Sequence, residues 1–292
     1  MAAQQESRFL NYSRNMVFAL LTQFVTIALN LIGRRVFVQQ LDIEYLGLGG
    51  LFTNILSILS LAELGIGHAI IYSMYKPIAI SDNEKIKSLM KLYKKVYVSV
   101  GILMLAIGAI IAPGVESLIK DAPDIEGLSL IFMLFVVQSA STYFFSYKTN
   151  FLLAMQKNYI LQIFDIINSV AMLSLQIISL ILFKNYYIYL ILSIVCPLIK
   201  NMLATIYVNR RYPFLREKAQ SLEKQEVKKI SKNVFALFLY KISSTLSATI
   251  DTILVSKFLG IIEVAIYYNY HFILAFSDKL FITVLGTITP SL

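Results

Sequence analysis

The sequence contains no tryptophan, a single cysteine and only two histidines among its 292 residues. These residues cannot supply an intrachain disulfide, a metal-ligand cluster or a catalytic thiol–histidine pair, so we expect no metal and no cofactor. Charged residues are also scarce, at 15% of the chain, against about a quarter in ordinary soluble domains. With 58% hydrophobic residues and a mean hydropathy of +0.71, the composition excludes a typical soluble enzyme and indicates an integral membrane protein.

Glycine (12 residues) and proline (6 residues) are few and follow no period, which excludes a collagen-like chain. Abundant phenylalanine and tyrosine exclude a disordered chain. The formal net charge of +9 would indicate nucleic-acid binding if the basic residues formed one face of a soluble module. They lie instead in short connectors between apolar runs, so we expect anionic membrane lipids, and no nucleic acid, as neighbours.

Apolar stretches near 20 residues, the length that crosses a bilayer as a helix, recur along the chain. They predict eight membrane spans, at residues 16–33, 45–75, 96–115, 127–147, 158–183, 185–209, 233–256 and 262–285. Residues 1–15 then form an amino-terminal segment, 16–208 a six-helix lobe, 209–232 a basic connector, and 233–292 the start of a second lobe. The expected fold is an all-α integral membrane protein with six helices in the first lobe and the first two helices of the second.

Basic residues are distributed unequally over the connectors. If the amino terminus is cytoplasmic, the inner segments hold 18 Lys and Arg residues and the outer segments hold five. The positive-inside rule therefore places both ends of the chain in the cytoplasm. A short sequence motif that begins at Ser13 recurs in closely similar form at Ser231, after six predicted spans. A repeat at this position would relate two lobes by an axis along the membrane normal.

Two local patterns give further expectations. Ser81 with Glu84 three residues later indicates a capping box at the start of an amphipathic helix. We expect this helix to lie along the inner membrane surface and to continue into the third span. Because tryptophan is absent, tyrosine must form the interfacial aromatic belt. The tyrosines predicted at the outer rim are Tyr186, Tyr187, Tyr189, Tyr267, Tyr268 and Tyr270.

Ionisable side chains within the predicted spans are the first candidate functional residues, because leaving each in lipid costs roughly 3 kcal/mol. They are Glu63, Asp165, Lys200, Lys241, Asp251, Asp278 and Lys279.

Depth along the helices shows which of these charges can meet. Counted from the outer turn between their two helices at about 1.5 Å per residue, Asp165 and Lys200 lie at similar depth. The same count pairs Lys241 with Asp278. Each pair is either a structural salt bridge or part of the lining of a hydrated cavity.

Arg34 and a second arginine follow the first span and are expected near the outer interface. They contact headgroups or the nearby Asp42 and Glu44, unless one of them faces inward. Residues 47–50 (Gly-Leu-Gly-Gly) do not follow a strand and lack the lysine of a phosphate-binding loop, so close helix packing explains them better. We find no catalytic motif and expect no enzymatic activity.

The second span and its surroundings contain sequence motifs that are specific to one family. Residues 44–52 read EYLGLGGLF, 59–67 read LSLAELGIG, 71–77 read IYSMYKP, and 251–260 read DTILVSKFLG. These segments closely resemble the Wzx-like polysaccharide and oligosaccharide flippases of the multidrug/oligosaccharidyl-lipid/polysaccharide exporter superfamily. Those proteins move lipid-linked sugar repeats across bacterial cytoplasmic membranes.

The resemblance implies two six-helix lobes around a central cavity that opens alternately to each side of the bacterial cytoplasmic membrane. It implies an undecaprenyl-diphosphate-linked oligosaccharide as substrate and a gradient, not ATP, as energy source. Partners would be that lipid, the surrounding membrane lipids, and a polysaccharide polymerase or glycosyltransferases. Because the family has a complete second lobe, we expect this chain to be a fragment that is inactive alone.

The resemblance also implies a cationic cavity. Arg34 matches the arginine that family members place at the end of the first span, and Lys200 and Lys241 would supply further positive charge. The full set of candidate cavity residues is Arg34, Glu63, Asp165, Lys200, Lys241, Asp251 and Asp278.

Three other functions remain open. A drug or cation antiporter of the same superfamily would place a carboxylate, such as Asp165, at the centre of the cavity. A membrane-bound glycosyl- or acyltransferase would need an acidic or histidine site on a loop, where the long connector has only scattered glutamates. A non-transporting scaffold of a polysaccharide assembly complex would need no cargo site.

Overall fold

The computed structural model describes residues 2–60, 66–120, 125–223, 225–228, 230, 249–272 and 274, and these contain helices and no β-strand. The α-helices are α1 (Ala2–Gln40), α2 (Ile43–Leu59), α3 (Ile66–Ala79), α4 (Asn83–Ile111), α5 (Leu128–Ala154), α6 (Asn158–Phe183) and α7 (Tyr186–Arg211). Two short 3-10 helices, η2 (Ala112–Leu118) and η3 (Pro213–Arg216), follow α4 and α7. Residues 225–228, 249–258 and 261–272 are also helical.

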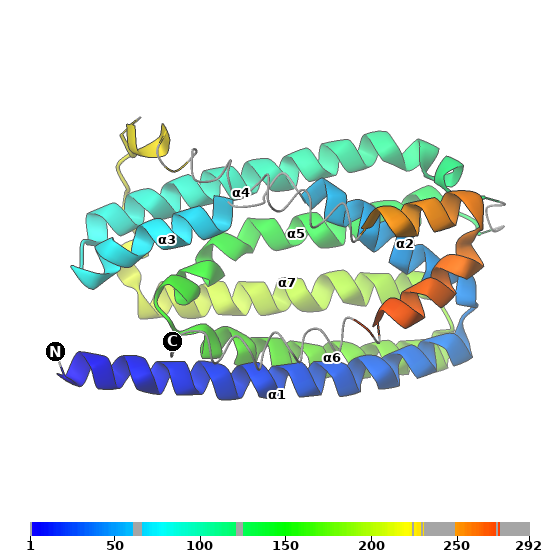
Figure 1. Ribbon diagram of the computed structural model, residues 1–292, viewed down its shortest axis with the longest axis horizontal. Coiled ribbons are helices and arrows are strands. Elements are labelled where there is room, and N and C mark those ends of the chain that lie inside the picture. The colour runs from blue at the N-terminus through cyan, green and yellow to red at the C-terminus, as the bar shows by residue number, and fades with distance from the viewer. Residues whose placement is uncertain are drawn as a thin grey trace.

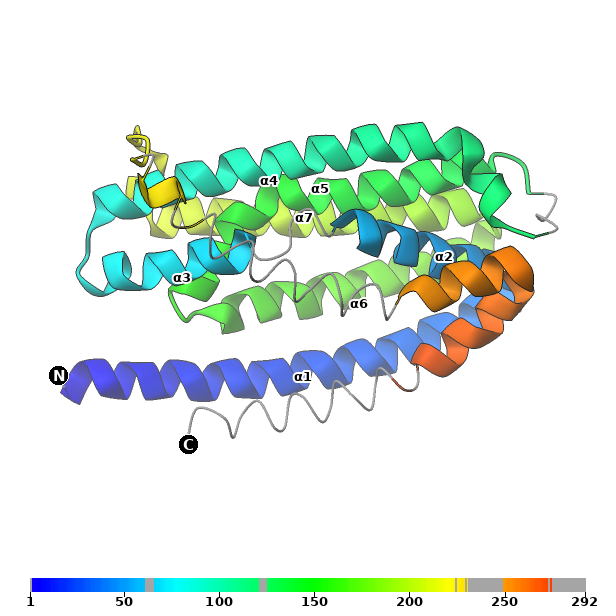
Figure 2. The ribbon, with the colours of Figure 1, turned by 45° about the horizontal axis from the view of Figure 1, so that its top comes forward.

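The long helices lie side by side along one axis (Figure 1). Packing contacts join α1 to α6, α6 to α7, α7 to α5, and α5 to α4. Helices α2 and α3 lie one after the other along the bundle, and both pack on α5. Figure 2 shows segments 249–258 and 261–272 as a hairpin beside the start of α2. We call the end of the bundle where α1 and α4 begin the basic end, and the other the opposite end.

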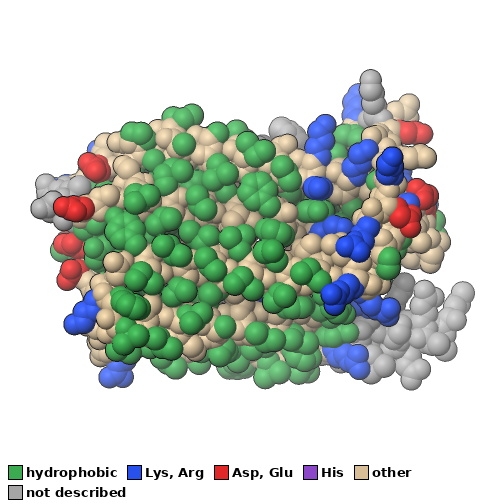
Figure 3. Space-filling view, turned by 180° about the vertical axis from the view of Figure 1, so that it is seen from behind, with side chains coloured by type: hydrophobic (Ala, Val, Ile, Leu, Met, Phe, Trp, Pro, Cys, Tyr) green, Lys and Arg blue, Asp and Glu red, His purple; other side chains and the backbone are tan. Residues whose placement is uncertain are grey.

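In the part of the chain that the structure describes, five helical stretches are long and apolar enough to cross a membrane: Met16–Gln40, Asn83–Leu118, Leu128–Ala154, Asn158–Phe183 and Tyr186–Arg211. Figure 3 shows a wide apolar surface over the middle of the bundle, with charged side chains gathered at its two ends. Large apolar residues of this surface, such as Ile110 and Leu182, are strongly exposed. An exposed apolar band of this extent is suited to lipid contact. The chain is therefore an all-α, multi-pass membrane protein.

Five predicted spans correspond to the five long helices. Predicted span 45–75 is divided between α2 and α3, and residues 61–65 lie outside the described part of the chain. The last two predicted spans are described only at residues 249–258 and 261–272. The repeat at Ser231 also lies outside the described residues, so the division into two lobes stays a prediction.

The start of α4 differs from the expected capping box. Ser81 adopts a φ of 56°, and Asp82 is the N-cap, with its carboxylate accepting a hydrogen bond of 3.0 Å from the backbone N–H of Lys85. A short carboxylate one residue later satisfies the same unpaired helix donors. As expected, α4 continues into the third span. Its first turns extend the axis of that span, however, and do not turn aside along a surface (Figure 1).

The connector after α7 packs on the lysine-rich first turns of α4. Lys85 forms an ion pair with Glu226, and Lys87 Nζ lies 2.8 Å from Glu217 Oε2. Lys91 Nζ donates to a connector carbonyl oxygen 3.1 Å away. These contacts fix the described part of the connector at the basic end.

Candidate functional site

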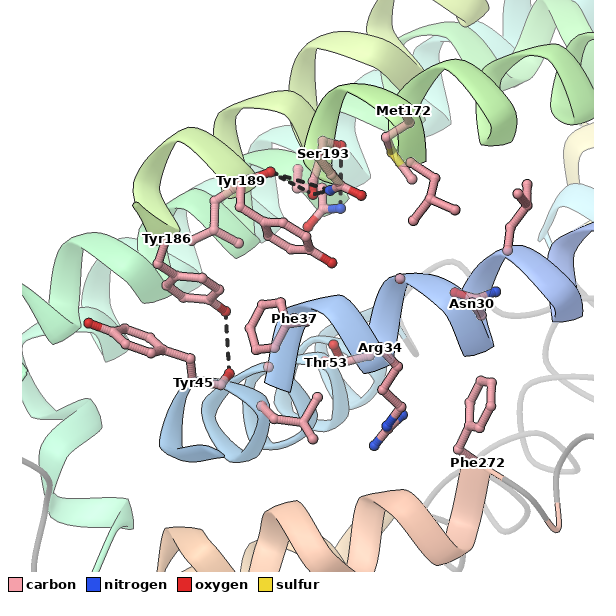
Figure 4. Close-up of a pocket in the computed structure, with 18 of the residues that line it drawn as sticks. Asn30, Arg34, Phe37, Tyr45, Thr53, Met172, Tyr186, Tyr189, Ser193 and Phe272 are labelled. Atoms are coloured by element: carbon pink, nitrogen blue, oxygen red, sulfur yellow. Dashed lines mark hydrogen bonds between the residues drawn. The ribbon is translucent and has the colours of Figure 1, made fainter. Parts of the chain in front are cut away.

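A cavity of about 390 Å³ lies between α1, α2, α5, α6 and α7, and residues from helix 261–272 complete its wall (Figure 4). Its aromatic lining consists of Phe37, Tyr45, Phe135, Tyr186, Tyr189, Tyr268 and Phe272. Its polar lining includes Thr26, Asn30, Arg34, Thr53, Gln138, Ser169, Gln176 and Ser193. Pockets that bind small molecules combine apolar and aromatic walls with a few polar groups in this way.

Glycines allow the neighbouring helices to approach this cavity closely. A Cβ atom at Gly33 would lie 2.4 Å from Leu173 Cδ1 on α6. A Cβ atom at Gly47 would lie 2.2 Å from the backbone oxygen of Ile261, and one at Gly50 would lie 3.0 Å from Tyr268 Cγ. The glycines of α2 therefore bring helix 261–272 against α2, which confirms the close packing predicted for residues 47–50.

Arg34 projects from α1 toward helix 261–272. Its Nε donates a hydrogen bond to Asn269 Oδ1, and its Cζ lies 5.0 Å from the ring centroids of both Tyr268 and Phe272. Its Nη2 is buried and has no hydrogen-bond partner among the described residues. The adjacent Arg35 is exposed. Of the two arginines, Arg34 alone lines the cavity, and its guanidinium retains unused donors for an anion.

The aromatic wall is built from the end of α1 and the start of α7. The ring centroid of Phe37 lies 5.9 Å from that of Tyr186 and 5.1 Å from that of Tyr189. The ring centroids of Tyr45 and Tyr186 are 4.5 Å apart. The predicted tyrosine belt is therefore wrong for Tyr186 and Tyr189, and also for Tyr268. These three line the cavity, whereas Tyr270 is exposed.

Polar side chains on α5, α6 and α7 form a hydrogen-bonded layer at the back of the cavity. Gln176 Nε2 donates to Ser193 Oγ at 2.8 Å and to the carbonyl oxygen of Tyr189 at 3.4 Å. Gln138 Nε2 donates to the carbonyl oxygen of Ser193 at 3.4 Å. The dashed lines in Figure 4 include bonds of this layer. This layer joins three helices and orients the amide groups that face the cavity.

A second cavity, of about 380 Å³, lies between α2 and α5 and shares three lining residues with the first: Thr53, Phe135 and Gln138. Hydroxyl groups dominate its remaining polar lining, from Ser57, Ser60, Ser139, Thr142 and Tyr143. These residues lie further along α2 and α5, toward the basic end. The two cavities therefore adjoin and extend through much of the bundle.

Asp165 and Lys200 form the ion pair that the depth count predicts. Lys200 Nζ lies 2.9 Å from Asp165 Oδ1, and the two side chains are 24% and 44% exposed, respectively. Asp165 precedes the cavity residue Ser169 by four positions, and Lys200 follows the cavity residue Ser193 by seven. These spacings place both charges on the cavity-lining faces of α6 and α7, about 6–10 Å closer to the basic end.

Other polar groups in this part of α6 and α7 have no partner. Gln162 Oε1, Thr205 Oγ1 and Asn209 Oδ1 are buried without a hydrogen bond among the described residues. Gln162 precedes Asp165 by one helical turn. Because buried polar groups are nearly always paired with protein or water, Gln162 Oε1, on the cavity-lining face of α6, is suited to bind water beside the Asp165–Lys200 pair.

Asp251, the one remaining candidate that the structure describes, is not in this arrangement. Asp251 is exposed, lies outside the described lining of both cavities, and accepts a 3.3 Å hydrogen bond from the Tyr267 hydroxyl. Glu63, Lys241 and Asp278 lie outside the described residues. Within the described part of the chain, no group of three or more His, Cys, Asp or Glu side chains could hold a metal ion.

Sequence reasoning missed the aromatic and amide lining of the cavity. Its signal lies in the recurrence of lining positions every three or four residues, as at Thr26, Asn30, Arg34 and Phe37 on α1 and at Tyr186, Tyr189 and Ser193 on α7. A lipid-facing stripe has the same period. The period therefore identifies a face but not what the face contacts.

One comparison with known proteins identifies a family. A family model described as "Polysaccharide biosynthesis protein" matches residues 12–292, which is nearly the whole chain. No curated protein and no solved structure shows significant similarity to the chain.

Proposed function

Since the chain belongs to the polysaccharide biosynthesis protein family of membrane flippases, we propose that it moves an undecaprenyl-diphosphate-linked oligosaccharide across the bacterial cytoplasmic membrane by alternating access. The proposal assigns no chemical reaction to the chain. A polymerase or glycosyltransferases acting on the same lipid-linked sugar would be its protein partners.

The observation that carries this proposal is the combination of one anion-binding group and a wall suited to sugars in the same cavity. Arg34 has a buried Nη2 without a partner, and charge-assisted bonds from guanidinium to phosphate are strong and directional. The aromatic rings of Tyr189 and Tyr268, which are half-buried in the cavity lining, offer flat apolar faces to sugar rings. In the adjoining cavity, hydroxyl groups such as those of Ser57 and Thr142 can exchange hydrogen bonds with sugar hydroxyls.

A hydrated route is needed because each unsatisfied polar group of a sugar would cost several kcal/mol in hydrocarbon. The lysine-rich basic end is then the cytoplasmic end, by the positive-inside rule. At a cytoplasm-negative membrane potential, outward movement of negative charge gains about 2.3 kcal/mol per charge per 100 mV. Transport of a diphosphate can therefore be downhill without a coupled ion.

Alternating access also needs a closure between the cavity and the cytoplasm. The Asp165–Lys200 pair lies on the cavity-lining faces of α6 and α7, nearer the basic end. We assign it to that closure, so that the pair separates when the cavity opens inward. Its partial exposure is consistent with a contact that water can reach and replace.

The test is a flipping assay with the protein expressed in full length from its gene and reconstituted in vesicles. Arg34→Gln removes the charge but keeps side-chain hydrogen bonding, and Arg34→Lys restores the charge without the fork geometry. We expect Arg34→Gln to reduce the rate by at least about tenfold, the effect of losing one charged hydrogen bond, with partial recovery in Arg34→Lys. The matched control is Arg35→Gln, on the exposed neighbour. Equal rates for Arg34→Gln and wild type would refute this assignment.

The antiporter alternative needs an available carboxylate in the cavity. Among the described lining residues of the first cavity, the charged side chain is an arginine, and Asp165 is already paired with Lys200. Both observations favour an anionic cargo. Protection of cells against a cationic drug that is lost in Asp165→Asn would reverse this preference.

A further inference from the structure

A buried lysine at the basic end lies apart from both cavities. Lys148 of α5 is only 8% exposed. Its Nζ donates one long hydrogen bond, 3.4 Å, to the carbonyl oxygen of Leu215 at η3. An ammonium group has three donors. No carboxylate among the described residues forms an ion pair with Lys148.

The charged side chains near Lys148 have the same sign as its own. Lys94 of α4 and Arg216 of η3 both interact with it electrostatically. The Nζ atoms of Lys94 and Lys148 lie 6.0 Å and 5.9 Å from the centroid of the same Tyr147 ring. Lys94 and Arg216 are exposed, so solvent or a headgroup can reach this cluster.

Lys87 shows how the same fold accommodates a buried lysine with internal partners. It is 5% exposed, and its Nζ lies 2.6 Å from Glu84 Oε1 and 2.8 Å from Glu217 Oε2. Glu217 follows Arg216 directly, yet it is engaged by Lys87. Lys148 thus has similar burial without a counter-ion, and a buried charge without one is strongly unfavourable.

We propose that Lys148, Lys94 and Arg216 bind a phosphate group, supplied by the headgroup of an anionic phospholipid or by free phosphate. Three cations, one of them buried, attract an anionic phosphate, and the guanidinium can engage two of its oxygens. Lys148 lies six residues before the end of α5, about 9 Å along the helix axis. This depth places the site near the basic end of the bundle, at the level expected for headgroups.

The experiment measures the unfolding temperature of the purified protein in neutral detergent, with added phosphatidylglycerol, phosphatidylcholine or inorganic phosphate. The variants are Lys148→Met, Lys94→Met and Arg216→Gln. Lys95→Met is the matched control, because Lys95 is the exposed neighbour of Lys94 and undergoes the same loss of charge.

We expect phosphatidylglycerol to raise the unfolding temperature of wild type and of Lys95→Met more than phosphatidylcholine does. Lys148→Met should weaken the apparent affinity for the anion at least about tenfold, as expected for loss of a charged hydrogen bond. Lys94→Met and Arg216→Gln should weaken it by smaller factors. A matching response to inorganic phosphate, with the same order among the variants, would identify free phosphate as a ligand. A response to phosphatidylglycerol alone would identify the lipid headgroup.

A purely structural role predicts a different pattern. In neutral detergent without anion, Lys148→Met should be at least as stable as wild type, because the variant removes an uncompensated buried charge. A variant that is less stable than wild type in every condition, yet keeps the full response to anion, would overturn the proposal. If Lys148→Met does not fold, unchanged anion responses in both Lys94→Met and Arg216→Gln would overturn it equally.

Discussion

Removal of one member of the Asp165–Lys200 ion pair should destabilise the protein more than removal of both. An unpaired charge at the bilayer centre costs about 3 kcal/mol on the insertion scale. The two side chains are 44% and 24% exposed, so we reduce this cost by roughly half for solvent screening. Asp165→Asn and Lys200→Met should therefore each lower the free energy of unfolding by about 1–2 kcal/mol.

The assay is reversible unfolding in mixed micelles, carried out as a double-mutant cycle. If the pair interacts as the 2.9 Å contact indicates, the double variant should lose less stability than either single variant, which requires a coupling energy larger than one single loss, more than about 1–2 kcal/mol. The exchanged pair, Asp165→Lys with Lys200→Asp, should recover part of the coupling. A coupling energy indistinguishable from zero would refute the view that these charges shelter each other.

Three further predictions concern packing and the connector. Gly47→Ala should destabilise the protein by about 1–3 kcal/mol, because the new Cβ meets a backbone oxygen at 2.2 Å. In thermal unfolding, Gly114→Ala, with open space around it, should stay within about 0.5 kcal/mol of wild type. Tyr186→Ala should cost about 3–5 kcal/mol in the same assay, whereas Tyr186→Phe should cost little, since its hydroxyl makes only a 3.5 Å hydrogen bond. Lys87→Met should increase hydrogen exchange in residues 213–223, because Glu217 loses its 2.8 Å partner; unchanged exchange would show that other contacts hold the connector.

Helix positions could be predicted well wherever the physical constraint is one of length. Apolar runs near 20 residues predicted α5, α6 and α7 within a few residues at most ends, because hydrocarbon thickness fixes the length of a span. The pairing of Asp165 with Lys200 could be predicted for a similar reason, since the rise per residue converts sequence distance into depth.

Which face of each helix contacts protein, and which contacts lipid, could not be predicted in the same way. Tyr186 and Tyr189 begin a span at the opposite end, where a rim tyrosine is expected, yet both turn toward α1. Their burial depends on Phe37, which is about 150 residues away in the sequence. In a membrane protein, lipid-facing and protein-facing surfaces are both apolar, so hydropathy does not separate them. The cavity was missed for this reason, although Arg34 was expected at its level.

The cavity between α2 and α5 has a uniform polar lining, and this uniformity affects the rate of transport. Its described polar lining consists of hydroxyls and one amide, without a charged group. A sugar passing along it would replace one weak hydrogen bond with another of similar strength. The free energy of the sugar would therefore change little along the cavity. Such a surface favours speed over discrimination and tolerates changes in sugar composition. Under the proposed function, selectivity would then rest on the diphosphate of the lipid-linked cargo.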